Sequence, residues 1–327
     1  MSALINQRSR NFAGKDRNIP TEWKGYEYPS SKNPRKDVER NSPSLRDGIS
    51  TKEETIVKEI ASMYMGKLGM SLFISQYTIG IAHIFFHRFF SRQSLKEHSW
   101  QLVALTSVFL ATKVEETPKK LDEIVMFHFK LEQQSAQVGS DTFKSIRNNV
   151  LHCERVLLHT LAFEIGVMPP QKHVLILGNA MKANAKGSQN TASALGNTTS
   201  SSNFDNDRKS RLSEFNSLMN HAISFINDTD KTTLTLQYPP HYIAIASLLL
   251  SDKIMSLKFK DSWKQKNPLS SLSDDLDPPS EENLNDICSQ MMDVYQVPRD
   301  KTSADEAHLY GDGDENRARK KRRKEMG

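Results

Sequence analysis

The stretch VALTSVFLATKVEETPKK, residues 103–120, runs from apolar side chains into a cluster of charge. Its first part is apolar on nearly every side and has small residues at close-packing spacing, a pattern typical of a helix in the middle of a bundle. It then reaches Lys113, Glu115 and Glu116. A lone charge at the end of a buried helix is costly to desolvate, so each of these charges needs a partner. We predict a central helix from about Trp100 to Glu116.

A second segment of the same kind lies further along the chain. IAIASLLLSDKI (243–254) aligns with 103–114, and the alignment sets Lys253 on Lys113. Both segments follow an amphipathic helix. A repeat of about 140 residues, each copy with a central apolar helix, indicates two copies of one helical bundle. Chance similarity between two apolar helices is the alternative.

Capping signals mark the helices around the first central segment. STKE, beginning at Ser50, has the form of a capping box at a helix start. Gly69 is a candidate for the end of that helix. Another helix is expected to follow Ser75, and Thr117 with Pro118 would be the N-cap and first residue of a fourth.

The expected fold is all-α, with two tandem five-helix bundles, a flexible N-terminal arm and a basic C-terminal tail. The fifth helix of the first bundle is expected to end near Gly166. The predicted domains are a basic arm at 1–41, a first bundle at 42–166, a second at 167–299 and a disordered basic tail at 300–327. Within the second bundle, residues 183–211 are rich in Ser, Asn, Thr and Gly, which predicts a disordered low-complexity insertion.

Composition and motifs argue against an enzyme. The 327 residues carry a formal charge of +5 and contain no GxGxxG, Walker, HExxH or GxSxG motif. We therefore expect no catalytic residue, no cofactor and no metal site. Cys153 and Cys288 lie in apolar periodic segments and are expected to be core residues in a reducing compartment. The N-terminus lacks the apolar core of a signal peptide, and the apolar runs are too short to span a bilayer.

The predicted fifth helix, like the central helix, carries a charged residue among apolar ones. Glu154 lies on a stripe formed by Val150, Leu157 and Leu161. Two interpretations of this acid and Lys113 have equal weight. The two side chains pair only with each other, or they offer an acceptor and a donor to another protein.

Several segments together resemble a cyclin, and more narrowly the transcriptional cyclins of the K and T types. They are ERNSPS (39–44), HRFF (87–90), FLATKVEETPKKLDEIV (109–125), CERVLLHTLAFEI (153–165) and FINDTDKTTLTLQYPP (225–240). KVEETPKK is the most specific, whereas NDTDKTTLTLQY and DICSQMMDVY (286–295) favour the K type. The resemblance covers roughly 39–183 and 212–297. It implies two stacked cyclin boxes of five helices, each with a buried third helix.

The resemblance also implies a function and a set of site residues. A chain of this kind is a non-catalytic subunit that binds and activates a transcriptional cyclin-dependent kinase, which phosphorylates the C-terminal domain of RNA polymerase II and promotes elongation. The residues implied to bind the kinase's mobile helix are Lys113, Val114, Glu116, Glu154, Leu158, Phe163 and Ile165. Lys253 lacks the two glutamates that follow Lys113, so we expect no kinase contact there.

The C-terminal tail contains RARKKRRK, whose basic residues are Arg317, Arg319, Lys320, Lys321, Arg322, Arg323 and Lys324. We expect a nuclear localisation signal and a nuclear protein, with weak, salt-sensitive RNA or DNA contact by the tail as the alternative. The rival function from another class is a two-box nucleic-acid-binding transcription factor of the TFIIB kind, without a kinase partner. Such factors carry an N-terminal zinc ribbon, and no cysteine precedes Cys153.

Overall fold

The computed structural model describes residues 24–31, 33–132, 138–192, 201–256 and 276–296. Within these ranges the regular elements are twelve helices, and no strand occurs. The chain divides into two compact units. The first contains the arm up to Tyr26 and Glu39–Ile165, and the second contains Glu27–Val38 and Gly166–Val294. The predicted all-α class is confirmed.

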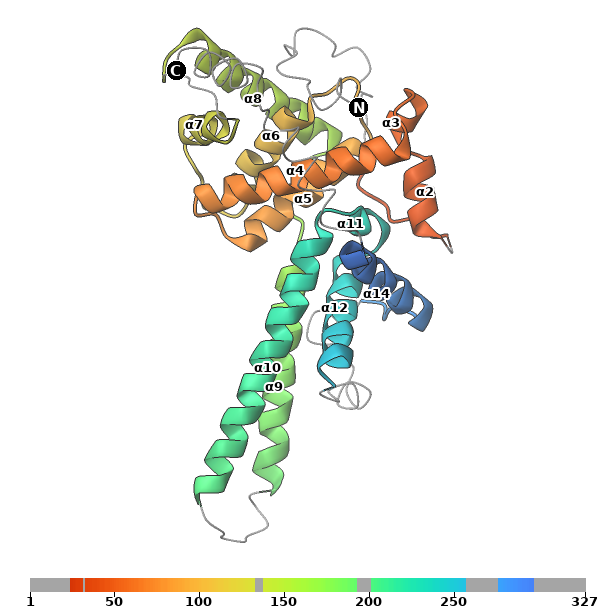
Figure 1. Cartoon of the computed structure of the whole chain (residues 1–327), viewed down its shortest axis with the longest axis vertical. Coiled ribbons are helices and arrows are strands. Elements are labelled where there is room, and N and C mark those ends of the chain that lie inside the picture. The colour runs from red at the N-terminus through yellow and green to blue at the C-terminus, as the bar shows by residue number, and fades with distance from the viewer. Residues whose placement is uncertain (1–23, 32, 133–137, 193–200, 257–275, 297–327) are drawn as a thin grey trace, which may run out of the picture. The chain divides into compact units, whose positions relative to one another are not determined.

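The first unit is built around α6. Its helices are α3 (Pro43–Arg46), α4 (Thr51–Ser71), α5 (Gln76–Phe90), α6 (Trp100–Val114), α7 (Leu121–Leu131) and α8 (Asp141–Thr160). Helix α6 packs against α4, α5, α7 and α8 (Figure 1). From Trp100 to Thr112 every residue of α6 except Gln101 is buried. The central helix predicted from its all-round apolar pattern is confirmed, although it ends at Val114, two residues earlier than expected.

Two of the predicted helix starts are confirmed by hydrogen bonds. The Ser50 hydroxyl accepts a bond from the Glu53 amide (3.3 Å), and the Glu53 carboxylate accepts one from the Ser50 amide (3.1 Å), which completes the capping box. The Ser75 hydroxyl accepts a bond from the Thr78 amide (3.2 Å) at the start of α5. Each cap satisfies an amide that has no partner within the helix.

Two predicted boundaries are wrong. Gly69 does not end α4, which continues to Ser71. A Cβ at Gly69 would collide with the side chain of Ile79, so the glycine allows α5 to approach α4 closely. Thr117 and Pro118 do not begin α7, which starts at Leu121. The Thr117 amide instead donates back to the Thr112 carbonyl (3.0 Å).

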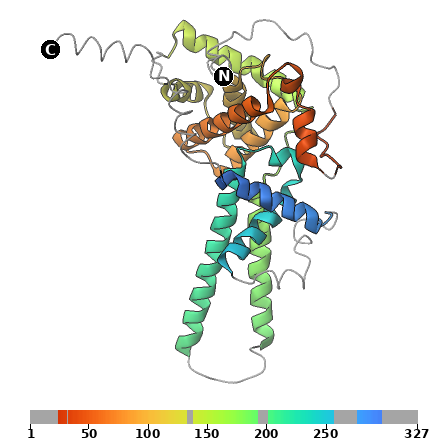
Figure 2. The same ribbon diagram turned by 45° about the vertical axis from the view of Figure 1, so that its right-hand side comes forward.

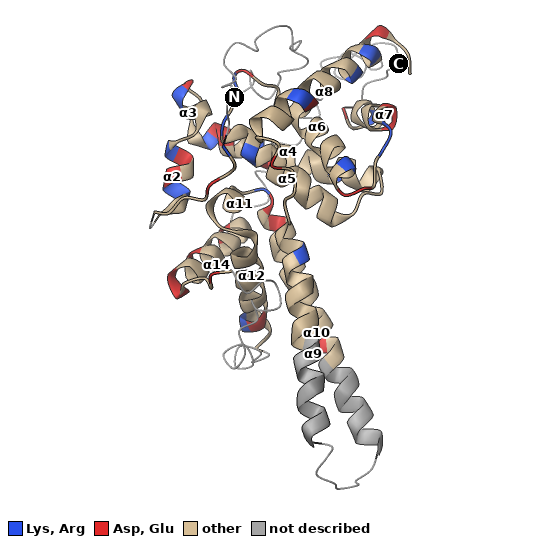
Figure 3. Cartoon of the chain, turned by 180° about the vertical axis from the view of Figure 1, so that it is seen from behind, with Lys and Arg blue, Asp and Glu red and all other residues tan. Residues whose placement is uncertain are grey.

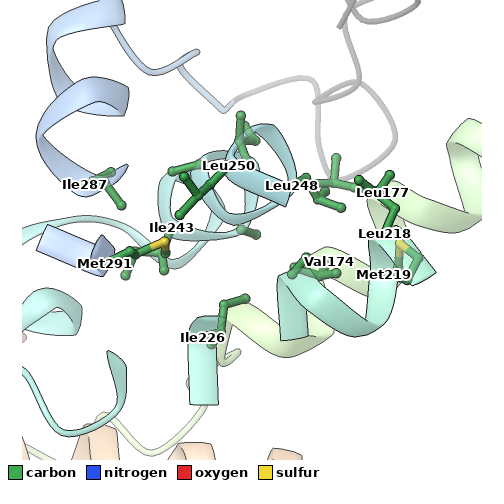
Figure 4. Packing of buried hydrophobic residues seen from close by; sticks show 14 of the residues in the cluster. Val174, Leu177, Leu218, Met219, Ile226, Ile243, Leu248, Leu250, Ile287 and Met291 are labelled. Atoms are coloured by element: carbon green, nitrogen blue, oxygen red, sulfur yellow. The ribbon is translucent and has the colours of Figure 1, made fainter. Parts of the chain in front are cut away.

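The second unit is built in the same way around α12. Its helices are α9 (Pro170–Ala192), α10 (Ser201–Thr229), α11 (Leu234–Gln237), α12 (Pro240–Met255) and α14 (Glu281–Gln296). Figure 4 shows Ile243, Leu248 and Leu250 of α12 in a core to which α9, α10 and α14 contribute. This unit also includes the start of α2 (Pro34–Arg40), where Arg35 Nη1 lies 3.5 Å from Asp293 Oδ2 of α14.

The segment predicted to be a disordered insertion differs from the structure in its described parts. Helix α9 continues to Ala192, and α10 already begins at Ser201, while 193–200 lies outside the described residues. The two helices run antiparallel (Figures 1 and 2). A helix that is already nucleated extends at little further cost, even where the composition offers few residues to bury. Although both helices are long, none of those described is apolar enough over a sufficient length to cross a membrane.

Candidate functional site

The end of α6 places Lys113 beside α8. Its Nζ lies 2.7 Å from Glu154 Oε1 and 4.1 Å from the centre of the Phe109 ring. The lysine side chain is 43% exposed and that of Glu154 is 13% exposed. The two candidate charges therefore meet each other in the chain, as the first interpretation required. They meet at the surface, where a second protein can still reach them.

The energetics of this ion pair favour an accessible role over a structural one. An exposed ion pair contributes only about 0.2–1 kcal/mol to folding, because water screens the charges and the long side chains lose freedom. The exposed Lys113 can therefore turn to a partner at small cost, whereas Glu154, only 13% exposed, needs another donor in place of the lysine.

Apolar candidates lie next to this pair on both helices. Val114 follows Lys113, and Leu158 lies one helical turn after Glu154 on α8; both are partly buried. Phe163 follows the end of α8, and its amide donates to the Leu158 carbonyl (2.9 Å). The Phe163 side chain is 66% exposed, and Ile165 is partly buried. We call these residues, with Lys113, Glu116 and Glu154, the α6–α8 face.

Helices α6 and α8 end in the same strained way. In each, a residue two positions past the last helical one adopts a left-handed conformation, Glu116 (φ 53°) after α6 and Ala162 (φ 54°) after α8. Paired backbone bonds close both ends: Glu116 to Lys113 and Thr117 to Thr112 after α6, and Ala162 to His159 and Phe163 to Leu158 after α8. This is a Schellman motif, which normally uses glycine.

Phe163 repeats the left-handed conformation, with φ 58°. Such conformations cost about 1–3 kcal/mol each for residues other than glycine and persist only where the surroundings hold them. Two of the seven candidates, Glu116 and Phe163, occupy them. The fold therefore holds the backbone at these two surface positions in conformations that the surrounding structure must support.

A group of charged residues that the sequence did not single out contacts the end of α8 and the turn after it. Glu164 lies between Phe163 and Ile165, and its Oε1 lies 3.1 Å from Nη1 of the buried Arg88 on α5. Arg92 donates to the Thr160 carbonyl (2.6 Å) at the end of α8. Arg88 stands in a helix that is otherwise almost wholly buried, and a buried arginine needs a partner. An arginine within the apolar segment 79–90 was therefore the feature of the sequence that could have predicted a buried ion pair.

The neighbouring cysteine takes no part in the surface chemistry. Cys153 is fully buried beside Glu154, and burial raises the pKa of its thiol to about 12. The thiol is therefore protonated and unreactive at neutral pH. Cys288 is partly buried, and burial raises its pKa to about 11.

The charge on the described surface is mixed in sign. On the side shown in Figure 3, basic and acidic residues are interspersed on α2 and at the far end of α8. Among the residues that the structure describes, no group of three or more His, Cys, Asp or Glu is placed to hold a metal ion. The basic residues of 317–324 lie outside the described residues.

Comparison with known proteins matches a domain of this chain. The family described as "Cyclin, N-terminal domain" matches residues 34–166. Cyclin-T1-5 of Arabidopsis thaliana is 29% identical over 290 residues, which are 85% of this chain and 43% of that protein. Putative cyclin-T1-1 of the same plant is 27% identical over 80% of this chain and 92% of its own length.

Solved structures agree on the fold. A chain of the yeast RNA Pol II CTD kinase CTDK-1 complex superposes with a TM-score of 0.59 at 17% identity, covering 85% of this chain and 76% of that one. A chain of the yeast TFIIK (Kin28/Ccl1/Tfb3) complex gives 0.53 at 15% identity, over 81% and 95%.

The relatives found carry the name of the T type, one of the two types that the sequence resembles. The chain spans less than half the length of several of them, for example 43% of cyclin-T1-5 and 46% of cyclin-T1-4. The matched domain, the similarity along most of the chain and the shared all-helical fold lead to one conclusion: residues 34–166 carry a cyclin N-terminal domain, and the chain is similar to T-type cyclins over most of its length.

Proposed function

We propose that this chain is the non-catalytic regulatory subunit of a transcriptional cyclin-dependent kinase that phosphorylates the C-terminal domain of RNA polymerase II. The observation that carries the proposal is the α6–α8 face, where an exposed ion pair lies among partly exposed apolar residues in a cyclin fold. The names of its relatives and the kinase complexes that contain similar folds support the same function.

The chemistry of the face suits a helix as its ligand. The last carbonyls and first amides of a helix lack partners within it. Because Lys113 and Glu154 lie together, the Glu154 carboxylate can accept from the free amides at the first turn of such a helix while the Lys113 ammonium donates to a carbonyl of the chain just before it. Val114, Leu158 and Phe163 then supply apolar contact. In such interfaces the apolar anchors supply most of the affinity, whereas charges set register and orientation.

Activation follows from binding one conformation of the kinase. A protein kinase is competent when the glutamate of its mobile helix pairs with the strand lysine that holds the ATP phosphates. A face that binds this helix only in its inward position shifts the kinase towards the active state without taking part in the chemistry. Elongation as the output and a nuclear location, with 317–324 as the import signal, belong to the same proposal.

The test is co-expression of this chain with each candidate transcriptional kinase, followed by phosphorylation of a heptad-repeat peptide from RNA polymerase II. We expect one kinase to require the chain for activity, and we expect Lys113→Glu and Glu154→Lys each to abolish that activity. Circular dichroism should show unchanged helix content in both variants. A chain that forms no complex with any candidate would contradict the proposal and favour the nucleic-acid-binding alternative.

A further inference from the structure

The described end of the N-terminal arm is tied to the first unit by Arg88 of α5 and by Arg92, which follows the end of that helix. Arg92 Nη2 donates to the carbonyls of Lys24 (2.6 Å) and Gly25 (3.1 Å). One helical turn earlier, the Arg88 guanidinium carbon lies 4.9 Å from the centre of the Tyr26 ring. We call Lys24–Tyr26 the strap.

The strap and the turn after α8 share the same partners. The Tyr26 amide donates to Glu164 Oε2 (2.6 Å), while Arg88 pairs with Oε1 of the same carboxylate (3.1 Å). Arg92 Nη1 donates to the Thr160 carbonyl (2.6 Å) while its Nη2 holds the strap. Each arginine therefore joins the strap to the segment that carries Phe163.

Most of the strap's contacts come from its backbone. They use two carbonyls and one amide, and a side chain at Gly25 would come within 3.2 Å of Glu164 Oε2. The glycine thus permits the close approach of the two segments. Because these contacts use backbone atoms, the pattern of apolar residues in the sequence does not predict them.

The turn after α8 needs support of this kind. Ala162 and Phe163 are consecutive left-handed residues without glycine, and such strain persists only where neighbouring structure over-determines it. Glu164 is the first residue beyond them. With both of its carboxylate oxygens bound, Glu164 ties the backbone of the turn that carries Phe163 to Arg88 and to the strap.

We infer that the strap is a positioning element for the α6–α8 face: it holds the turn in the conformation that presents Phe163, without itself contacting the kinase. This rests on the proposed function. Glu164, Arg88 and Arg92 are then positioning residues for kinase binding, and the first residues of the described chain regulate an interface formed by its fifth cyclin-box helix.

The test compares Tyr26→Pro with Tyr26→Phe in the full chain. Proline removes the amide that donates to Glu164 and the ring beside Arg88, whereas phenylalanine keeps both. Affinity is measured for the kinase found by co-expression, and hydrogen exchange is followed at the amides of Phe163 and Glu164. We expect Tyr26→Pro to weaken binding about tenfold, a typical coupling between linked sites, and to speed exchange at both amides. Tyr26→Phe should match the wild type.

Three outcomes would overturn the inference. Undiminished binding by Tyr26→Pro would overturn it alone and leave the proposed function standing. Weaker binding with unchanged exchange at Phe163 and Glu164 would show that the strap contacts the kinase directly. A wild-type chain that binds no candidate kinase would overturn the proposed function and this inference with it. Arg92→Met, which cuts the link from the other side, should repeat the effect of Tyr26→Pro.

Discussion

The central helices α6 and α12 contact the last helix of their own unit at equivalent positions. The two units differ in one charge on that last helix. The Cys153 thiol of α8 lies close to Thr106 of α6, and Cys288 of α14 lies 3.5 Å from the carbonyl of Ala246 of α12. In the alignment of 103–114 with 243–254, Thr106 and Ala246 occupy the same position. The two cysteines are thus equivalent in the two bundles.

The residue after each cysteine shows the difference. In the first unit it is Glu154, which pairs with Lys113; in the second it is the exposed Ser289. The second unit keeps the equivalent Lys253, also exposed, without a carboxylate at the matching place. A bundle of this kind packs without the ion pair, which indicates that Lys113 and Glu154 serve something other than packing.

The largest expected effect comes from exchanging the two charges. The double variant Lys113→Glu with Glu154→Lys keeps an internal ion pair but presents the wrong charge to each backbone group of the bound segment. We expect kinase affinity to fall about 100-fold or more, because each buried charge at the interface would face a like partner. The matched change Lys253→Glu should leave affinity unchanged. Normal binding by the double variant, measured by calorimetry, would make the pair an internal bridge.

A smaller effect is expected from two glycines at close helix contacts. A Cβ at Gly69 would collide with Ile79 of α5, and one at Gly178 with Met219 of α10. Isoleucine is stiff, so Gly69→Ala should lower the free energy of unfolding by about 1–3 kcal/mol. Methionine can move aside and alanine favours a helix by up to about 1 kcal/mol, so Gly178→Ala should be near neutral.

Denaturant titration of the full chain, with hydrogen exchange to locate the loss in one unit, checks this pair of substitutions. Equal destabilisation by both would mean that the second core is packed as rigidly as the first.

An effect of similar size is a dependence on pH in the first unit. Burial lowers the pKa of His128 to about 4, and its Nδ1 lies 2.8 Å from the Tyr64 hydroxyl. Between about pH 6.5 and 4 the unfolded chain binds the proton and the folded chain does not, so stability falls as the pH falls. We expect a loss of about 2 kcal/mol across this window.

His128→Gln should flatten that dependence, as measured by thermal unfolding at several pH values. In the second unit burial also lowers the pKa of His173 and His241, so some loss in acid should remain in the variant. An unaltered pH profile in His128→Gln would assign the whole effect to those two residues or to carboxylates.

The parts of the fold that the sequence predicted are those set by local chemistry or by simple periodicity. The caps at Ser50 and Ser75 depend on residues within one turn, and the burial of α6 follows from its composition. The boundary predictions at Gly69 and Thr117 failed because neighbouring structure decides them. Gly69 serves the contact with α5, and the Thr117 amide closes α6 instead of leading into α7.

The candidate site was predicted in part. Lys113 and Glu154 were chosen as unpaired charges on apolar faces, and the structure brings them to 2.7 Å. Their role in binding a kinase stays a proposal. Glu164 and its partners could not be predicted, because their bonds join segments 68 to 138 residues apart and several of the partners are backbone atoms.

The second unit is not one continuous piece of chain, and this affects how it can fold during synthesis. Its residues Glu27–Val38 leave the ribosome before the helices of the first unit, whereas Asp293, the partner of Arg35, lies 258 residues further along the chain (293 minus 35). The segment must wait while the whole first unit is made and can fold. Contacts so distant in sequence form slowly, and the chain exposes unfinished apolar surface in the meantime. The first unit can therefore be complete while the second has only its opening residues and still lacks Gly166–Val294.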